Sequence, residues 1–452
     1  MKLHVGIDLG STTTKAVILG DAGTILGRGI TNSRSNYKVA CDVALGEALI
    51  STRFALLENA CAQKGTPIAE GVLTRLELLF RKQQFLTQLA ALAEVVRSFI
   101  PARERSGVAG KRVETIFQSM EKEADEMFRP GGHRKSDFFR DLAGSMYLRL
   151  AESLAQKDEM PFDRLVGLFD KAILDVENRP PGSDNFGVHA RAAMAEFTDA
   201  PPVLHGVIME TVSVLLEVER SVGTGYGRAT LPFPKEQIRS EILCHGLGAH
   251  AMFPNTRSVL DIGGQDTKAI QVDERGIVTS FQMNDRCAAG CGRYLGYIAD
   301  EMNVGLQELG PMACQSTRPA RINSTCTVFA GAELRERLSL GEKREDILAG
   351  LHRAIILRAM SLLARSGGVS NEFTFTGGVA RNPAAVNALR GLVTENYGAL
   401  TMNISPDSIY TGALGAALFA SRTPSTEPLP GSDEASATGN RGADSNASKE
   451  AA

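Results

Sequence analysis

The chain has 452 residues, of which 43% are hydrophobic and 22% are charged, a length sufficient for two or three globular domains. The net charge of −3 predicts no basic surface for nucleic acid. The sequence shows neither a secretory leader pattern nor an uncharged run near the ~20 residues of a membrane helix. We therefore expect a cytoplasmic protein without nucleic-acid or membrane partners, whose seven cysteines are buried, metal-binding or redox-active.

A segment near the N-terminus occurs a second time in the middle of the chain. Residues 8–26 align without a gap with residues 261–279, and Asp, Gly, Thr, Lys and Ala recur at the same offsets. An apolar run precedes each copy, and a glycine recurs at Gly23 and Gly276. Each copy therefore predicts strand, turn, strand, turn, strand. Two such units facing each other would place an acidic residue and a glycine-rich hairpin on each side of one cleft, which suits a nucleotide triphosphate with a divalent cation.

The two hairpins contain the groups that bind phosphate and Mg²⁺. Asp8 and Asp261 end their strands where carboxylates can hold Mg²⁺ through water, and Gly10 lets the backbone approach a phosphate closely. Lys15 adds charge there or is a solvated strand residue. The remaining candidates are the hydroxyl, amide or glycine residues Ser11, Thr12, Thr13, Gly263, Gly264 and Gln265, the last also a candidate catalytic group. No G-x-x-x-x-G-K-[ST] motif occurs, so the site is not a P-loop.

A leucine-rich and charged region follows the first copy. Residues 55–215 show helical periodicity and little alternation, with breaks near Pro130 and Pro180, so they predict a helical insertion that serves as a decoration or a docking surface. The prediction divides the chain into a first lobe of 1–54 and 216–281, the insertion at 55–215, a second lobe of 282–422 and a tail of 423–452. The tail contains too little apolar surface to order itself.

A third motif follows an apolar strand at residues 373–376. Gly377 and Gly378 would let the backbone pack flat on an adenosine, and Pro383 is placed to begin the next helix. Together, the two hairpins and this glycine pair resemble the superfamily of actin, sugar kinases and the large heat-shock chaperone ATPases. The resemblance implies an α/β fold of two ribonuclease-H-like lobes, with a helical insertion, that closes on ATP about a hinge.

Two cysteines each precede an amphipathic helical pattern, namely Cys287 and Cys326. A thiolate at a helix N-terminus is stabilised by the helix dipole and free N–H groups, so its pKa falls. Two such helices would present two thiolates to one cluster, whereas a 4Fe-4S cluster takes four cysteines. A second chain would then supply the other two. The alternative is a four-cysteine set within one chain that adds Cys291 and Cys314.

Residues 284–292 and 324–330 resemble the cluster-binding segments of 2-hydroxyacyl-CoA dehydratase activators and of the ATPase subunits of ATP-dependent benzoyl-CoA reductase. These are the BadF/BadG/BcrA/BcrD-type ATPases, and the resemblance extends to residues 225–228 and 240–249. It implies that two ATPase subunits share one 4Fe-4S cluster through the cysteines that match Cys287 and Cys326.

On this resemblance we expect the ATPase subunit of a benzoyl-CoA reductase-type complex. It would pair with a second, homologous ATPase subunit, take electrons from ferredoxin and pass them to separate acyl-CoA-binding reductase subunits. The insertion favours this interpretation over an activator of a 2-hydroxyacyl-CoA dehydratase, which is the first alternative. An assembly or folding factor without a redox role and a sugar kinase are the others. Glu241 is the candidate that orients the hydrolytic water, unless it is a solvated helix residue.

Overall fold

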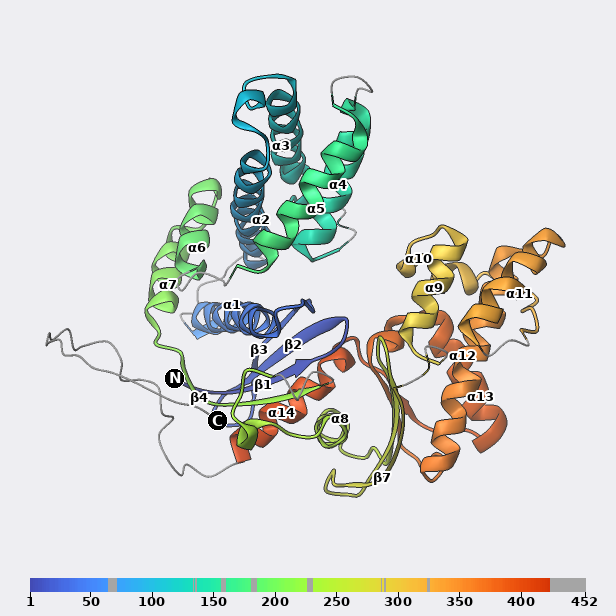
Figure 1. Cartoon of the computed structure of the whole chain (residues 1–452). Coiled ribbons are helices and arrows are strands. Elements are labelled where there is room, and N and C mark those ends of the chain that lie inside the picture. Colours follow the sequence, from blue (N-terminus) through green and yellow to red (C-terminus); the bar gives the residue numbers. More distant parts are fainter. Residues whose placement is uncertain are drawn as a thin grey trace, which may run out of the picture. The chain divides into compact units, whose positions relative to one another are not determined.

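The computed structural model describes residues 1–63, 71–132, 134, 136–155, 160–179, 185–225, 231–285, 287, 290–322 and 326–422 (Figure 1). The predicted disordered tail at 423–452 lies outside the described residues, as do parts of the motifs at 226–228, 286, 288–289 and 323–325. The fold below is that of the unit Met1–Ser421.

The two copies of the repeat each form three antiparallel strands, and each gains a parallel strand. The first sheet has the order β3-β2-β1-β4 and contains β1 (Lys2–Leu9), β2 (Thr13–Leu19), β3 (Ile25–Asn32) and β4 (Glu217–Gly225). The second has the order β7-β6-β5-β8-β9 and contains β5 (Ser258–Ile262), β6 (Thr267–Val272), β7 (Val278–Asn284), β8 (Phe373–Thr376) and β9 (Met402–Asn403). In both sheets, the first strand of the repeat pairs antiparallel with the second strand and parallel with the added one.

The sheet pairing divides the lobes differently from the sequence prediction. The prediction groups residues 216–281 with the first lobe, but of this range only β4 joins the first sheet, whereas β5, β6 and β7 lie in the second. The reason is that each copy of the repeat builds its own sheet. Helix α8 (Glu241–Met252) separates the two groups of strands along the chain.

Alternation along the strands decides which helix covers which face of each sheet. In the first sheet, Ala16 and Ile18 contact α1 (Tyr37–Gln63), whereas Val17 and Leu19 contact α14 (Thr411–Arg422). In the second sheet, Val259 and Ile270 pack against α8, and the opposite face covers the core of the second lobe. Helices α8 and α14 are in contact through Gly248 and Gly415, where any side chain would collide with the other helix (Figure 1). These two helices therefore join the inner faces of the two sheets.

The second lobe has its own large apolar core. It is built by α9 (Gly292–Met302), α10 (Leu306–Ala313), α11 (Thr327–Ser339), α12 (Arg344–Ser366) and α13 (Pro383–Tyr397), packed on β5, β6 and β8. Helix α12 is long and apolar enough to cross a membrane, but most of its apolar window is buried in this core. It is therefore the central core helix of the lobe.

The segment between β3 and β4 is helical, as predicted. It contains α2 (Val72–Ser98), α3 (Val108–Met127), α4 (Phe139–Leu154), α5 (Phe162–Glu177), α6 (Asn185–Glu196) and α7 (Pro202–Ser213). Helices α2–α5 share one apolar core. A second core joins the C-terminal half of α1 to the start of α2 and to α6 and α7. Helix α1 therefore belongs to the first lobe at its start and to the insertion at its end.

Candidate nucleotide and cysteine sites

The two aspartates of the repeat lie at matching places near the ends of β1 and β5. Asp8 is 4% exposed and Asp261 is 1% exposed. Ile7 and Leu9 face α1, so Asp8 between them faces α14; by the same alternation, Asp261 faces α8. Because α8 and α14 pack on each other, the two carboxylates face the same inner region between the sheets. This is the paired arrangement that the repeat predicts.

Each aspartate is paired across the hairpin with the repeated lysine. Asp8 lies opposite Lys15 and Asp261 lies opposite Lys268 in the strand registers. Lys15 Nζ is 3.8 Å from Asp8 Oδ2, so this lysine borders the site and is not a freely solvated strand residue.

Lys268 is buried among three carboxylates. Its Nζ lies 2.8 Å from Glu241 Oε1, 2.9 Å from Asp266 Oδ1 and 3.3 Å from Asp261 Oδ2. Burial alone would lower the pKa of Lys268, but the three carboxylates raise it well above its ordinary value. Despite its burial, the pKa of Asp261 is lowered, chiefly by His245 and Lys268. The site thus keeps a dense set of ionised groups, with acidic side chains in excess.

Glu241, the first residue of α8, is buried and is not a solvated helix residue. Burial raises the pKa of Glu241, and Lys268 opposes that shift. A carboxylate with a raised pKa is a better proton acceptor than an exposed one. The position therefore suits a group that orients and deprotonates water.

His245 is a site residue that the sequence reasoning missed. Its Nδ1 lies 3.3 Å from Asp261 Oδ1, and a Cβ on Gly412 would meet both His245 Nε2 and Asp8 Oδ2. The imidazole therefore lies between the aspartates of the two copies. Burial lowers its pKa, but Asp261 raises it, and the net shift is upward. Its spacing of four residues from Glu241, which places both on one helix face, was the available signal.

The two hairpins approach each other at their tips. A side chain on Gly264 would collide with Thr12, so the second hairpin needs glycine at this point. The predicted phosphate-binding residues remain at least partly accessible, in contrast to the buried aspartates behind them: Gly10, Ser11, Thr12, Thr13, Gly263, Gly264 and Gln265. The arrangement offers accessible backbone and hydroxyl groups in front of buried carboxylates.

The predicted adenosine motif lies beside the second hairpin. Gly377 has φ of 87°, and a side chain there would collide with the backbone of Ile262. Gly378 opens the short helix η4 (Gly378–Arg381), and no heavy atom lies within 4 Å of its Cβ position. Asn382 then caps α13, which begins at Pro383 as predicted. The glycine pair therefore presents bare backbone next to the hairpin.

The two candidate cluster ligands differ in their relation to the helices. Cys326 is exposed and is the N-cap residue of α11, as predicted. Cys287 is half-buried, and the helix expected directly after it begins only at Gly292, with Cys291 as its N-cap. The helix cannot start earlier because Gly290 has φ of 104°. The expectation that Cys287 itself sits on a helix tip is therefore wrong.

The other cysteines do not favour a four-cysteine set. Cys291 is buried, and burial raises the pKa of its thiol although backbone N–H groups oppose this. A protonated, buried thiol is a poor metal ligand. Cys41 and Cys244 are buried as expected, and burial raises their pKa to about 12.

Helices α9 and α11 run in parallel, which places the cysteine segments at the same end. A side chain on Gly331 would collide with Tyr297, and Arg335 forms an ion pair with Glu301. Both pairs are 34 residues apart in the sequence, a constant offset that defines parallel neighbours. Cys326 therefore lies at the same end as the start of α9. Two accessible cysteines at one end fit two ligands of a cluster.

Hydrogen bonds attach the second hairpin to the start of α9. The N–H groups of Gly292 and Arg293 donate to the carbonyls of Gly263 (2.8 Å) and Gly264 (2.6 Å). In addition, Thr267 Oγ1 donates to the carbonyl of Gly290 at 2.5 Å. The candidate phosphate loop and the cysteine segment are thus one connected unit.

Two sheets of this topology, with facing hairpins and paired aspartates, define an actin-like ATPase fold. Component A of (R)-2-hydroxyglutaryl-CoA dehydratase from Acidaminococcus fermentans has the same fold, with a TM-score of 0.52 and 24% identity over 93% of this chain and 98% of that one. The chain belongs to the BadF/BadG/BcrA/BcrD ATPase family, whose model matches residues 5–420.

Two curated relatives bear on the partner enzyme. The (R)-2-hydroxyglutaryl-CoA dehydratase activating ATPase of Acidaminococcus fermentans is 44% identical over 200 residues, which are 44% of this chain and 74% of that protein. A benzoyl-CoA reductase subunit from Thauera aromatica is 32% identical over 223 residues, 49% of this chain and 78% of that protein. Since 200 residues make up 74% of the activating ATPase, it is much shorter than this chain. The helices α2–α7 have the size to account for much of the difference.

Proposed function

We propose that this chain is an ATP-hydrolysing electron activator of a 2-hydroxyacyl-CoA dehydratase-type enzyme. The higher identity to a dehydratase activator than to a benzoyl-CoA reductase component favours this role over the one expected from the sequence. The observation that carries the proposal is the set of hydrogen bonds between the second hairpin and the start of α9, because it connects phosphate binding to the cysteines.

At the nucleotide end, the two hairpins hold the phosphates, and Asp8 and Asp261 hold Mg²⁺ through water. Gly377 and Gly378 lie against the adenosine. Glu241 accepts a hydrogen bond from the attacking water and takes its proton as the bond to the γ-phosphate breaks. Lys268 keeps Glu241 in place through its 2.8 Å ion pair.

At the cysteine end, Cys287 and Cys326 supply two ligands, and the same residues of a second, homologous ATPase subunit supply two more. A 4Fe-4S cluster bound there accepts one electron at a time and passes it on. Movement of the hairpin carries Gly290, Gly292 and Arg293 with it, which changes the dipoles and solvent exposure beside the thiolates. These surroundings set the potential of a cluster.

The electrons would come from a ferredoxin-type donor and pass to a separate acyl-CoA-binding partner. The test is anaerobic purification followed by iron and sulfide counting. We expect one 4Fe-4S cluster per two chains, which is lost in Cys287→Ser and in Cys326→Ser and is retained in the matched control Cys291→Ser. Protein without an iron–sulfur chromophore, or with a chromophore that ignores added nucleotide, would contradict the proposal.

A component of a benzoyl-CoA reductase-type complex is the second candidate, supported by the match to the Thauera aromatica protein. The two roles differ in how much ATP they use. An activator primes its partner and consumes far less than one ATP per product, whereas a reductase component spends ATP on every electron delivered. Measuring the phosphate released per acyl-CoA converted separates them.

A further inference from the structure

The first hairpin is held from behind by Ser33, which directly follows the turn out of β3. The Ser33 hydroxyl donates to the carbonyl of Gly10 at 2.6 Å, and the Ser33 N–H donates to the carbonyl of Thr12 at 2.9 Å. Its Oγ also lies 3.0 Å from Thr14 Oγ1. One residue therefore fixes both sides of the loop that we assign to phosphate binding.

The next residue, Arg34, points to the insertion. Its guanidinium donates to the main-chain carbonyl of Glu177, the last residue of α5, and to Thr31 Oγ1 at 3.4 Å. A cation at a helix C-terminus is favoured by the helix dipole and satisfies a carbonyl that has no partner within the helix. The Glu177 carboxylate is in turn paired with Arg140 at the start of α4, at 3.1 Å. Arg34 thus holds the α4–α5 end of the bundle.

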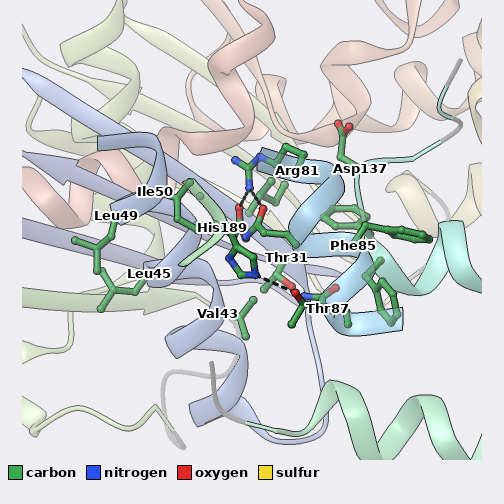
Figure 2. A pocket seen from close by; sticks show the side chains of 18 of the residues that line it. Thr31, Val43, Leu45, Leu49, Ile50, Arg81, Phe85, Thr87, Asp137 and His189 are labelled. Atoms are coloured by element: carbon green, nitrogen blue, oxygen red, sulfur yellow. Dashed lines mark hydrogen bonds and ion pairs between the residues drawn. The ribbon is translucent and has the colours of Figure 1, made fainter. Parts of the chain in front are cut away.

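Around this bridge, the bundle and the first lobe are separated by a cavity. Its volume is about 1100 Å³, and it is lined from the lobe by Thr31 and Leu49 and from the insertion by Phe85 and His189 (Figure 2). The apolar core of α2–α5 contains no residue of the first sheet among those that the structure describes. Polar bridges cross the space instead, among them the ion pair of Arg81 with Glu47. A bundle held by such bridges can shift without repacking a core.

We propose that Ser33 and Arg34 couple the first phosphate hairpin to the α2–α5 bundle, so that the insertion responds to the nucleotide. When phosphate oxygens draw the Gly10–Thr14 loop, Ser33 moves with it, and Arg34 transmits the shift to the end of α5. Arg34 is a positioning residue and has no contact with the reacting atoms. This inference rests on the nucleotide site proposed above but not on the redox role.

The test is hydrogen–deuterium exchange of the intact protein without nucleotide, with ADP and with a non-hydrolysable ATP analogue. In the wild type we expect the analogue to change exchange both in the hairpin and at the end of α5. In Arg34→Ala the hairpin should still respond and the end of α5 should not. Arg34→Lys, which keeps a cation at the helix end, should restore part of the response. Arg179→Ala is the matched control, since Arg179 lies at the same helix end but pairs only with Asp175 among the described acidic residues.

Ser33→Ala tests the other half of the bridge by kinetics. Loss of one hydrogen bond to the hairpin, worth about 1 kcal/mol, should raise the KM for ATP about fivefold with little change in kcat. A hairpin that is protected while the end of α5 stays unchanged in the wild type overturns the coupling and leaves the nucleotide site intact. Absence of protection at both places overturns the nucleotide site as well. An equal loss of response in Arg179→Ala would also contradict a role specific to Arg34.

Discussion

The two copies of the repeat have the same backbone and different connections. Thr14 and Thr267 occupy the same position in the two copies. Thr14 lies 3.0 Å from the Ser33 hydroxyl, on the side that leads to the insertion, whereas Thr267 donates to Gly290, on the side that leads to the cysteines. A symmetric clamp therefore has two separate outputs. Duplication supplied the phosphate-binding geometry, and the segments that follow each copy gave it different tasks.

The lysines of the two copies differ in the same way. Lys15 lies near the single carboxylate of Asp8, whereas Lys268 is surrounded by Glu241, Asp261 and Asp266. Only the second copy therefore has a buried ionic centre, and it is this copy that adjoins the cysteine segment. The predictions below test this difference.

Replacement of Lys268 should have the largest effect. In Lys268→Met, three buried carboxylates lose their common partner, and we expect a loss of about 3–5 kcal/mol in the free energy of unfolding. Lys15→Met is the matched change in the first copy and should cost no more than about 1 kcal/mol, because that lysine makes one longer ion pair. Urea denaturation measures both. Equal losses would show that the two centres are equivalent.

Replacement of the aspartates should affect catalysis in both copies alike. Asp8→Asn and Asp261→Asn keep the side-chain shape and remove a charge that helps to hold Mg²⁺, so each should slow ATP hydrolysis by about 100-fold, or about 2.7 kcal/mol. The iron content should not change, because neither aspartate belongs to the cysteine segments. Steady-state phosphate release is the measurement. Normal turnover in either variant would refute the nucleotide assignment.

The threonine pair separates the two outputs. Thr267→Val leaves the carbonyl of Gly290 without its buried donor, at a cost of about 1–2 kcal/mol, and should remove the effect of nucleotide on the alkylation rate of Cys287. Thr14→Val should leave that effect intact and weaken the response of α5 instead. The alkylation rate and the exchange of α5 are measured in parallel on both variants. The same outcome in both would contradict separate outputs.

Sequence patterns predict local features here better than the features that depend on long-range packing. The gapless repeat predicts both hairpins and their aspartates, because turns and alternation are local. It does not tell which sheet receives β5–β7, since that depends on pairing with β8 more than a hundred residues away. Nor does it show that Cys287 lies ahead of the helix tip, because the break depends on the conformation of Gly290. His245 and Lys268 carry readable signals, but only burial identifies them as part of the site.

The smallest predicted effects distinguish two buried histidines by the sign of their pH dependence. His245, between carboxylates, has a raised pKa, so its contribution to stability is complete below the unfolded pKa of about 6.5 and is lost as the pH rises through the folded value. His352 has a pKa lowered by burial. Its Nδ1 faces the carbonyl of Leu348, and its Nε2 faces the amide nitrogen of Asn382. The neutral ring satisfies both of these groups.

The contribution of His352 is therefore complete above about pH 6.5 and is lost as the pH falls. Each histidine can change the free energy of unfolding by at most about 1.4 kcal/mol per pH unit. Urea melts from about pH 5 to about pH 8.5, a range that spans the ordinary histidine pKa, should show that His352→Gln flattens the acid side of the profile and His245→Gln the alkaline side. If His245→Gln leaves the alkaline side unchanged, the imidazole is not the charged bridge between the two aspartates. The inner ionic centre would then be held by Lys268 alone.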